Sequence, residues 1–482
     1  MTDYAIIQGS LSNLFEPQIS EASSSYVGSN SYRLDAGVYS SGALSVKNLL
    51  KSSTKKFTTL SSIADVFGFG PFKRTYIEDS EFGIPLLSSS EIMELEPTPK
   101  FMAKADNPKW TQYQIRQRWI LVSCSGTIGN IAIAPKKWDG WGVSQDAIRV
   151  LPQKGHLGFI YSFLRLPWMK ELIVGKKSGS VIDHIYEDDL KRIEVPIPNE
   201  YCIDELESTI NKVLNLREES DEHLSKANSL ITEINALAEL RKEATERYDP
   251  NRNIESVLIS SSEVLHNNHS GSEYRLDAHF YNPLAQLAMG NIRQSKSKVT
   301  TIGDVTERVF FLNRFARTFV NEDHGIPYLA GSDIIKIRPA NNHFLSKTQT
   351  NNLDQYLLHR GWILLTCSGT IGRTTFVWRN LESHAATHDL IRIIPNAVNI
   401  DAGYLYAFLS SQYGKQQVLR FTHGSVIDHI TPEQVKKVFI PLPSNIEQKT
   451  IGDLVRTAYE KRAEAIRLED EAQKILMDAL TQ

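Results

Sequence analysis

The sequence predicts two tandem copies of one α/β (α+β) module, each followed by a long α-helix, with the two helices packed as an antiparallel coiled coil. Three observations lead to this fold class. The 482-residue chain repeats itself once, at a spacing of about 240 residues. Each copy contains short apolar runs bounded by glycine- and proline-containing turns. Each copy then ends in a long stretch with an apolar residue at every third or fourth position.

Four blocks of sequence recur in the same order, which indicates an internal duplication. The blocks, in the first and then the second copy, are Tyr32–Ala36 and Tyr274–Ala278, Trp119–Gly129 and Trp362–Gly372, Gly179–Ile185 and Gly424–Ile430, and Pro196–Pro198 and Pro441–Pro443. The second block reads WILVSCSGTIG and then WILLTCSGTIG, and the third reads GSVIDHI both times. The offsets of 242, 243 and 245 residues leave room for only small insertions, and a repeat of this length is the size of a domain.

Within each copy, the apolar runs predict the strands and short helices of a mixed module with a mostly buried sheet. Strands are expected at Trp119–Ser123 and Ala147–Leu151 in the first copy, and at Trp362–Thr366 and Leu390–Ile394 in the second. Two further apolar runs, Ile193–Ile197 and Val438–Leu442, are closed by prolines. Short helices are expected at Leu157–Leu164 and Tyr404–Leu409.

The stretch after each Pro-x-Pro predicts a long helix. Residues 203–246 contain no Pro, Gly, Phe, Tyr or Trp, so a continuous helix there would be roughly 66 Å long at 1.5 Å per residue. The side chains expected to pack the two helices together are Leu206, Ile210, Val213, Ile231 and Ile234 in the first, and Ile451, Val455, Ala458 and Leu476 in the second. One helix cannot bury such a stripe alone, so we expect an antiparallel pair; a helical hairpin within an ordinary globular fold is the alternative.

These elements divide the chain into four parts. Residues 1–200 form the first module, 201–247 the central helix, 248–444 the second module and 445–482 the C-terminal helix. The net charge of −3 hides an uneven distribution, because the modules carry more Lys and Arg than Asp and Glu, while the central helix is acidic. Basic modules on acidic helices suit modules that face phosphates and helices that face protein.

Several classes of protein are disfavoured by what the sequence lacks. No apolar run is long enough to span a membrane, no signal peptide is evident, and the three cysteines include no CxxC pair, so we expect a cytoplasmic protein without a metal site. There is no P-loop, no amino-methyltransferase motif and no recognisable nuclease cluster. We therefore expect no catalytic residues.

The recurring blocks resemble the specificity (S) subunit of type I restriction–modification systems. The resemblance rests on the twice-occurring WIL-x-x-CSGTIG and GSVIDHI blocks, the Pro-x-Pro exit and the helix after each module, and it covers essentially the whole chain. It implies that each module is a target recognition domain that reads one half of a split double-stranded DNA site, and that the helices form a spacer. It also implies that two DNA methyltransferase (modification) subunits dock on the chain and that restriction subunits can join them. S-adenosylmethionine, ATP and Mg²⁺ would belong to those partners, so no cofactor is expected in this chain.

Candidate DNA contacts are cations and hydroxyls near the shared blocks or in segments that differ between the copies. Lys73, Arg74, Arg314 and Arg317 lie beside aromatic residues in divergent segments, where arginine could read guanine edges or hold phosphates. The two SGTIG turns could cradle phosphate, although a purely structural tight turn is the alternative. The full set is Lys73, Arg74, Ser125, Thr127, Lys136, Lys137, Lys176, Lys177, Arg314, Arg317, Ser368, Thr370, Arg373, Arg379, Arg420 and His423.

Two alternatives remain open at this point. The pairs Asp183–His184 and Asp428–His429 could be acid–base pairs, but neither has a nucleophile or metal-ligand pattern nearby, which favours a structural role. An enzyme with an unrecognised motif would act on DNA by itself. A duplicated protein-binding scaffold would have no DNA affinity, and its partner binding would be insensitive to salt.

Overall fold

The computed structural model describes residues 56–77, 80–174, 184–238, 240, 277–339, 343–424 and 428–481. The chain divides into two compact units. One contains the chain up to Met93 together with Pro97–Asn211 and Leu468–Gln482, and the other contains Glu94–Glu96 and Lys212–Arg467. The YRLDA blocks at Tyr32–Ala36 and Tyr274–Ala278 lie outside the described residues, apart from the last two residues of the second block.

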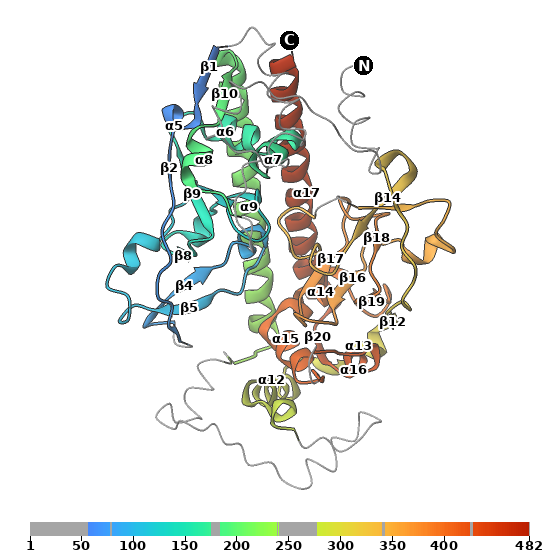
Figure 1. Ribbon diagram of the computed structural model, residues 1–482. Helices are drawn as coiled ribbons and strands as arrows, with labels where there is room; N and C mark the ends of the chain where they lie inside the picture. The colour runs from blue at the N-terminus through green and yellow to red at the C-terminus, as the bar shows by residue number, and fades with distance from the viewer. Residues whose placement is uncertain are drawn as a thin grey trace. The chain divides into compact units, whose positions relative to one another are not determined.

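The first unit is built on two four-stranded sheets and a two-stranded ribbon (Figure 1). Its elements are β1 (Lys56–Thr59), α5 (Leu60–Ile63), β2 (Ala64–Phe67), β3 (Tyr76–Ile77), β4 (Gly83–Leu87), β5 (Lys100–Ala103), β6 (Ile120–Ser123), β7 (Ile131–Ile133), β8 (Gly142–Val143), β9 (Ala147–Pro152), α6 (Leu157–Leu164), α7 (Pro167–Val174), α8 (Glu187–Lys191) and β10 (Glu194–Ile197). The strand orders are β2-β9-β6-β7, β3-β5-β4-β8 and β1-β10. All pairings are antiparallel except β4 with β8.

The second unit repeats this plan strand for strand. Its elements are α12 (Pro283–Arg293), β11 (Lys298–Thr301), α13 (Ile302–Val305), β12 (Thr306–Phe310), β13 (Phe319–Val320), β14 (Gly325–Leu329), β15 (Phe344–Ser346), β16 (Ile363–Thr366), β17 (Thr374–Phe376), β18 (Ala385–Ala386), β19 (Leu390–Pro395), α14 (Ala402–Ser410), α15 (Gln412–Leu419), α16 (Pro432–Lys436) and β20 (Phe439–Leu442). The strand orders are β12-β19-β16-β17, β13-β15-β14-β18 and β11-β20, and only β14 with β18 is parallel. The predicted duplication of a mixed module is confirmed, and the antiparallel sheets make each module α+β.

A long helix follows each Pro-x-Pro, as predicted. These are α9 (Glu200–Ile234, 35 residues) and α17 (Asn445–Thr481, 37 residues). Asn199 Oδ1 accepts from Cys202 N at 2.8 Å, and Ser444 Oγ accepts from Glu447 N at 3.4 Å, so a side chain caps the start of each helix.

The first long helix ends at Ile234, before Glu246, where the stretch predicted as a continuous helix ends. Asn235 Nδ2 donates to Ile231 O at 2.9 Å, and Ala236 is left-handed at φ 52°, so the backbone leaves the helix after Ile234. Absence of Pro and Gly permits a helix, but local capping decides where it stops.

Within the second unit, α9 and α17 pack antiparallel, as predicted. Glu219 of α9 pairs with Lys461 of α17, and Asp221 Oδ1 lies 3.2 Å from Arg462 Nη2. Further along α9, Leu224, Ala227 and Ile231 share a core with residues that lie earlier in α17, namely Ile451, Val455 and Ala458. Residue numbers thus rise along one helix while they fall along the other.

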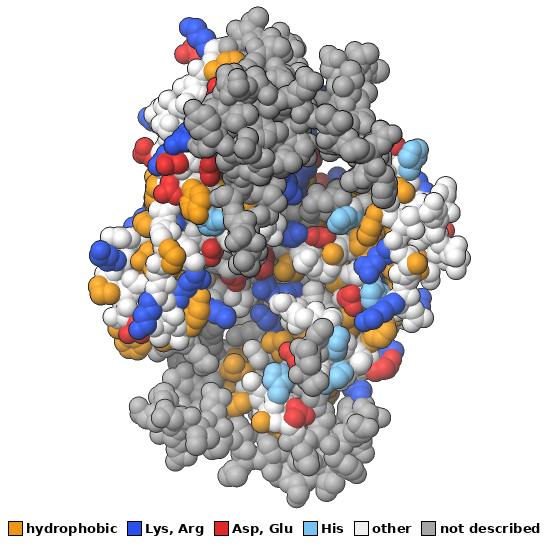
Figure 2. Space-filling view, in the orientation of Figure 1, with side chains coloured by type: hydrophobic (Ala, Val, Ile, Leu, Met, Phe, Trp, Pro, Cys, Tyr) orange, Lys and Arg blue, Asp and Glu red, His pale blue; other side chains and the backbone are white. Residues whose placement is uncertain are grey.

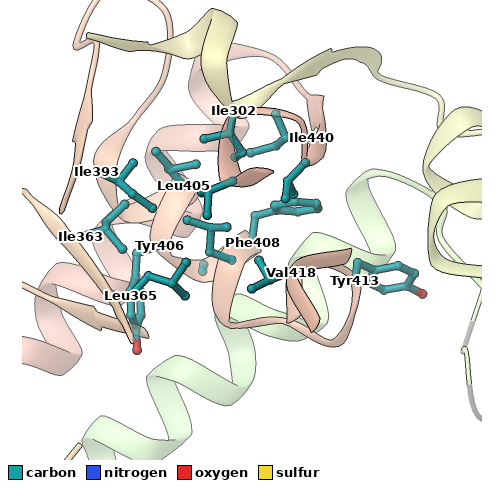
Figure 3. Packing of buried hydrophobic residues seen from close by; sticks show 14 of the residues in the cluster. Ile302, Ile363, Leu365, Ile393, Leu405, Tyr406, Phe408, Tyr413, Val418 and Ile440 are labelled. Atoms are coloured by element: carbon teal, nitrogen blue, oxygen red, sulfur yellow. The ribbon is translucent and has the colours of Figure 1, made fainter. Parts of the chain in front are cut away.

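The core of the second unit joins its sheet to α14 and the long helices. Figure 3 shows Ile363, Leu365 and Ile393 from the sheet facing Leu405 and Phe408 from α14. All five side chains are fully buried. Burying a side chain of this size contributes about 1.5–3 kcal/mol, so this core fixes the module on its helices.

Glycines allow the short helix of each module to approach a long helix very closely. A methyl group added at Gly158 of α6 would lie 2.3 Å from Leu206 O of α9. At the equivalent place in the second unit, a methyl group added at Gly403 would lie 2.7 Å from Gly452 Cα of α17. Only a residue without a side chain fits at either contact.

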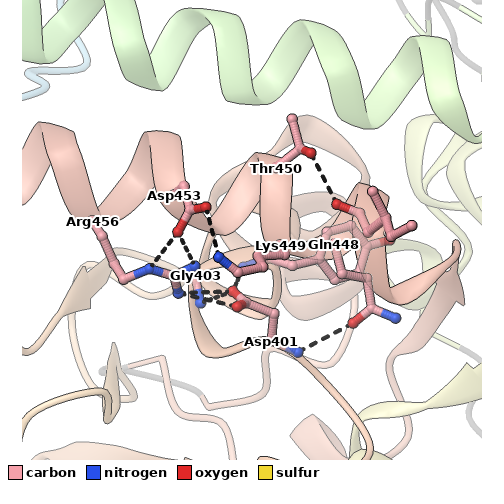
Figure 4. Close-up of polar contacts among 9 residues, drawn as sticks. Asp401, Gly403, Gln448, Lys449, Thr450, Asp453 and Arg456 are labelled. Carbon is pink, nitrogen blue, oxygen red and sulfur yellow. Dashed lines mark hydrogen bonds and ion pairs between the residues drawn. The ribbon is translucent and has the colours of Figure 1, made fainter.

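Polar bonds reinforce this contact in both units, in different ways. Asp401 Oδ1 caps α14 by accepting from Gly403 N at 2.8 Å, and it also accepts from Arg456 Nη1 of α17 at 3.1 Å (Figure 4). His156 holds the equivalent place in the first unit and provides no cap, so Glu207 Oε2 of α9 accepts from Gly158 N at 2.6 Å instead.

We predict that Gly403→Ala destabilises the protein, because the added methyl group overlaps the α17 backbone. Overpacking of this kind costs about 1–3 kcal/mol. Gly290→Ala is the matched control, since Gly290 also lies in a helix and has no atom within 4 Å of its would-be methyl group. That control should gain up to about 1 kcal/mol from helix propensity. Urea unfolding measures both, and equal midpoints for the two variants would contradict the close-approach argument.

Candidate nucleic-acid interface

In each module, three shared segments meet at the end of the central strand. In the first unit, Cys124 N donates to Asp146 O at 2.9 Å, and Ile185 N donates to Cys124 O at 3.0 Å. In the second unit, Ile430 N donates to Cys367 O at 3.1 Å. The backbone therefore brings the SGTIG turn next to the loop before β9 or β19 and next to the end of the GSVIDHI block.

The SGTIG turn is fastened from inside by the hydroxyl residue that precedes its cysteine. Ser123 Oγ donates to Thr127 O and accepts from Asn130 N at 2.9 Å. Thr366 Oγ1 makes the same two bonds, donating to Thr370 O at 2.6 Å and accepting from Arg373 N at 3.1 Å.

The exposed part of each turn consists of a glycine and a threonine. Gly126 and Gly369 have φ of 69° and 71°, which favours glycine, and Thr127 and Thr370 beside them are exposed. The turn is a structural element with an exposed threonine. Ser125, like its counterpart Ser368, is half-buried.

The divergent segments carry an arginine close to an aromatic stack. Phe72 stacks on Tyr113 with ring centroids 3.8 Å apart, and the equivalent Phe315 stacks on Tyr356 at 3.9 Å. Arg74 and Arg317 each follow two residues after the stacked phenylalanine. Lys73 and Arg314, which flank the stacks, are exposed. On the face shown in Figure 2, Lys, Arg and His side chains gather over the part of the second unit that Figure 1 labels β12, β14, β18 and β19.

The remaining candidate cations differ in how free they are to meet a ligand. Lys136 and Lys137 lie in an exposed turn of 3-10 helix. Arg379 pairs with Glu460 at 3.0 Å while remaining more than half exposed. Lys176 and Lys177 lie outside the described residues.

Two candidates of the second unit are engaged inside the protein. Arg373 is 15% exposed and pairs with Glu94 at 3.4 Å. Arg420 is 4% exposed, with its guanidinium 4.0 Å from the ring centroid of Phe280. Such burial argues against a phosphate contact for Arg420, because its charge is already desolvated on an aromatic face.

The Asp-His sequences contribute backbone rather than acid–base chemistry to this edge. His429 and His423 exchange backbone bonds of 2.7 and 3.0 Å, and Ser368 forms a β-bridge with His429. His184 forms the equivalent bridge with Ser125. Asp183 lies outside the described residues. Among the residues that the structure describes, no group of His, Cys, Asp and Glu could hold a metal ion.

The sequence analysis did not predict the lysine that lies beside each SGTIG turn. A methyl group at Gly129 would lie 3.6 Å from Lys170 Cγ, and one at Gly372 would lie 3.9 Å from Lys415 Cγ. Lys170 is exposed. Burial, with the nearby Arg373, lowers the pKa of Lys415. The signal for this pair was present, since the two lysines occupy equivalent places in the repeat.

The sequence reasoning also missed one fully buried arginine per module, Arg149 and Arg392. Arg149 donates to Val143 O and Ala147 O, both at 2.7 Å. Arg392 donates to the corresponding carbonyls of Ala386 and Leu390 at 2.9 and 3.1 Å. Burial lowers the pKa of each arginine to about 10. Each guanidinium therefore braces the loop before β9 or β19 from within the core.

The profile of the family described as "Type I restriction modification DNA specificity domain" matches residues 55–210 and 294–469, more than half of the chain. The chain belongs to this family. It is a non-catalytic DNA specificity subunit with two specificity domains, one in each copy of the repeat. No curated protein is similar enough to this chain to count as a relative. In the part of the chain that the structure describes, no helix is long and apolar enough to cross a membrane.

Solved structures with some likeness to this subunit include two other specificity subunits. A type I restriction–modification S subunit from M. genitalium is 15% identical over 89% of this chain and 96% of its own, with a TM-score of 0.28. The HsdS subunit from Thermoanaerobacter tengcongensis is 14% identical over 88% and 96%, also at 0.28. A third structure, from work on the assembly of a type I system, is 16% identical over 88% and 97%, at 0.27. With TM-scores this low, the family assignment rests on the profile match.

We predict that Arg149→Met loosens the loop at residues 144–146. The substitution keeps an apolar stem but leaves buried carbonyls without a donor, at a cost of about 1–3 kcal/mol for each. Arg116→Met is the control, because Arg116 is 56% exposed and its pair with Asp139 is 3.9 Å long, so it should change stability by less than about 1 kcal/mol. Hydrogen exchange at Ser144–Asp146 should quicken in the first variant alone, and equal protection in both would refute the bracing role.

Proposed function

We propose that this specificity subunit reads a bipartite site in double-stranded DNA, with one half-site for each specificity domain. The observation that carries the proposal is the separate match of each repeat to a DNA specificity domain. The functional parts would be residues 1–200 and 248–444 as readers, and 201–247 and 445–482 as spacer. A single-domain reader would need only one such match.

The spacer would set the unread gap between the half-sites by its length. The 35 residues of α9 correspond to about 52 Å of helix. The predicted packing residues of both helices, with the exception of half-buried Ile234, are at most 1% exposed, so the helices bury their stripes within the chain itself. A helix packed in this way is rigid, and a spacer that sets the distance between two DNA-binding domains has to be rigid.

The phosphate contacts would come from exposed cations and hydroxyls near the SGTIG turn and the aromatic stack. The exposed candidates are Lys73, Lys136, Lys137, Lys170, Thr127, Arg314, Arg317, Thr370, Arg379 and His423. Arg74 is half-buried and lies at the same edge. Contacts to phosphate position the protein, whereas contacts to base edges read the sequence.

Two DNA methyltransferase subunits would dock on this chain, and restriction subunits could follow. Tyr201 and Ile446 support a docking role for the helices. They occupy equivalent places in the first turns of α9 and α17, and they are 76% and 80% exposed. S-adenosylmethionine, ATP and Mg²⁺ would be bound by those partners.

The decisive experiment maps genome-wide methylation in cells that carry this gene and its neighbouring methyltransferase gene, and in cells that carry the methyltransferase gene alone. We expect a split motif that is methylated only when this chain is present. If the methyltransferase is expressed and the methylome does not change, the chain is better explained as a protein scaffold.

We predict that Lys73→Ala weakens DNA binding equally for all sequences. Removing one phosphate contact should lower the slope of log affinity against log salt by about 1. Lys191→Ala is the control, because Lys191 lies on α8 and already pairs with Asp188 at 3.2 Å. Affinity measured over a salt series tests this, and an unchanged slope in the Lys73 variant would remove Lys73 from the interface.

We also predict that Tyr201→Asp combined with Ile446→Asp impairs assembly with the methyltransferase. Both side chains are exposed, so the fold should survive while an apolar contact is lost. Val398→Asp is the control, since Val398 is 89% exposed and lies in a turn that is not part of either long helix. Co-purification and light scattering report the assembly, and normal assembly of the double variant would place the docking surface elsewhere.

A further inference from the structure

One loop in each specificity domain has a shared frame and a different central residue. Ser144-Gln145-Asp146 precedes β9, and Thr387-His388-Asp389 precedes β19, at an offset of 243 residues. A hydroxyl residue and an aspartate flank the centre in both copies. The two copies can therefore be compared with each other, and they have Gln145 and His388 at equivalent positions.

The flanking residues hold the loop backbone in the same way in both units. Ser144 N donates to Leu87 O, and Thr387 N donates to Leu329 O, each at 2.9 Å. Asp146 N donates to Ser144 Oγ at 3.2 Å. Likewise, Asp389 N donates to Thr387 Oγ1 at 3.4 Å. With the buried arginine beneath it, each loop has its backbone fixed by groups other than the central side chain.

An arginine at an equivalent position lies near each loop, and its contacts differ. Arg74 Nη2 donates to Gln145 Oε1, and it lies 3.9 Å from Asp146 Oδ2. In the second unit, Arg317 Nη1 donates instead to the hydroxyl of Tyr328 at 3.1 Å. The loop therefore keeps its conformation without a hydrogen bond from the arginine to the central residue. Its conformation also does not require one particular residue at the centre.

The central side chains keep hydrogen-bonding capacity for a ligand. The His388 side chain is 12% exposed, with Nε2 at 3.4 Å from Asp389 Oδ1, and its buried Nδ1 has no hydrogen-bond partner among the described residues. Burial lowers the pKa of His388, and the charges of Arg317, Arg314 and Arg392 lower it further against the opposite effect of Asp389. A neutral imidazole offers one donor and one acceptor. Gln145 is half-buried, and its amide nitrogen can donate while its oxygen accepts from Arg74.

We propose that positions 145 and 388 determine the specificity of the two domains. Gln145 reads an adenine edge in one half-site, His388 reads a guanine edge in the other, and Arg74 and Arg317 anchor the DNA beside them. The chemistry follows from the groove edges, because a glutamine amide matches adenine N6 and N7, and an imidazole N–H can donate to guanine N7 or O6. This inference rests on the proposed function, since it requires both domains to read DNA.

The test exchanges the two central residues in the full-length chain, co-expressed with its methyltransferase subunit. Gln145→His and His388→Gln are made separately, and the recognised motif is determined by methylation mapping. Each variant should change the preference at one base of one half-site, by roughly 10- to 100-fold, and leave the other half-site intact. Gln153→His is the matched control, because Gln153 is exposed at the opposite end of β9 and should leave the motif unchanged.

The outcomes separate this inference from the function on which it rests. If the wild-type chain yields no split motif, the proposed function itself fails. If the wild-type motif is present and neither exchange alters it, or if an exchange alters both half-sites, positions 145 and 388 do not determine specificity. Uniform loss of binding by a folded variant would make the residue an anchor and would also overturn the inference.

A second pair of variants covers the case in which an exchanged residue prevents folding. Gln145→Ala and His388→Ala remove the hydrogen-bonding group without adding bulk. Each should accept any base at the single position that its parent residue reads, with circular dichroism and thermal unfolding confirming the fold. Retention of the full wild-type preference by both alanine variants would refute the proposal.

Discussion

The close approach of one short helix to one long helix is the contact on which each module depends. Gly158 meets the backbone of α9, and Gly403 meets the backbone of α17. Because the backbones are in direct contact, the short helix cannot shift along the long helix. The sheets that pack on α6 and α14 are therefore held in one position on α9 and α17. Under the proposed function, this rigid attachment would let the length of the long helices set the distance between the two half-sites.

The two copies solve this attachment with different polar groups. Asp401 caps α14 and binds Arg456, whereas Glu207 of α9 replaces the missing cap above His156. In the first unit, buried Glu469 of α17 also accepts from Tyr161 and pairs with Arg165 at 2.8 Å. Duplication preserved the geometry of the contact, while the hydrogen bonds that secure it were exchanged.

The edge that carries the SGTIG turn and the aromatic stack shows the opposite balance, because its supporting residues recur in both copies while the side chains between them differ. The stack of Phe72 on Tyr113 recurs as Phe315 on Tyr356, and the bracing arginine recurs as well. A frame of this kind holds the variable side chains at defined places, which is what discrimination between bases requires. Under the proposed function, variation among a few supported side chains would change the target without rebuilding the domain.

The sequence by itself determined the duplication, the mixed modules, the strands around Trp119 and Trp362 and the two long helices, because apolar periodicity and repeated blocks are local properties of the chain. Only the tertiary structure decided that α9 stops at Ile234 and that Arg420 is buried against Phe280. It also decided that Lys170 lies beside Gly129, that Gln145 accepts from Arg74, and that buried Arg149 donates to Ala147 O. These features depend on residues far apart in sequence that meet through packing and backbone hydrogen bonds. No local pattern specifies such meetings, since exposure and partnership arise only when the sheets close over the core.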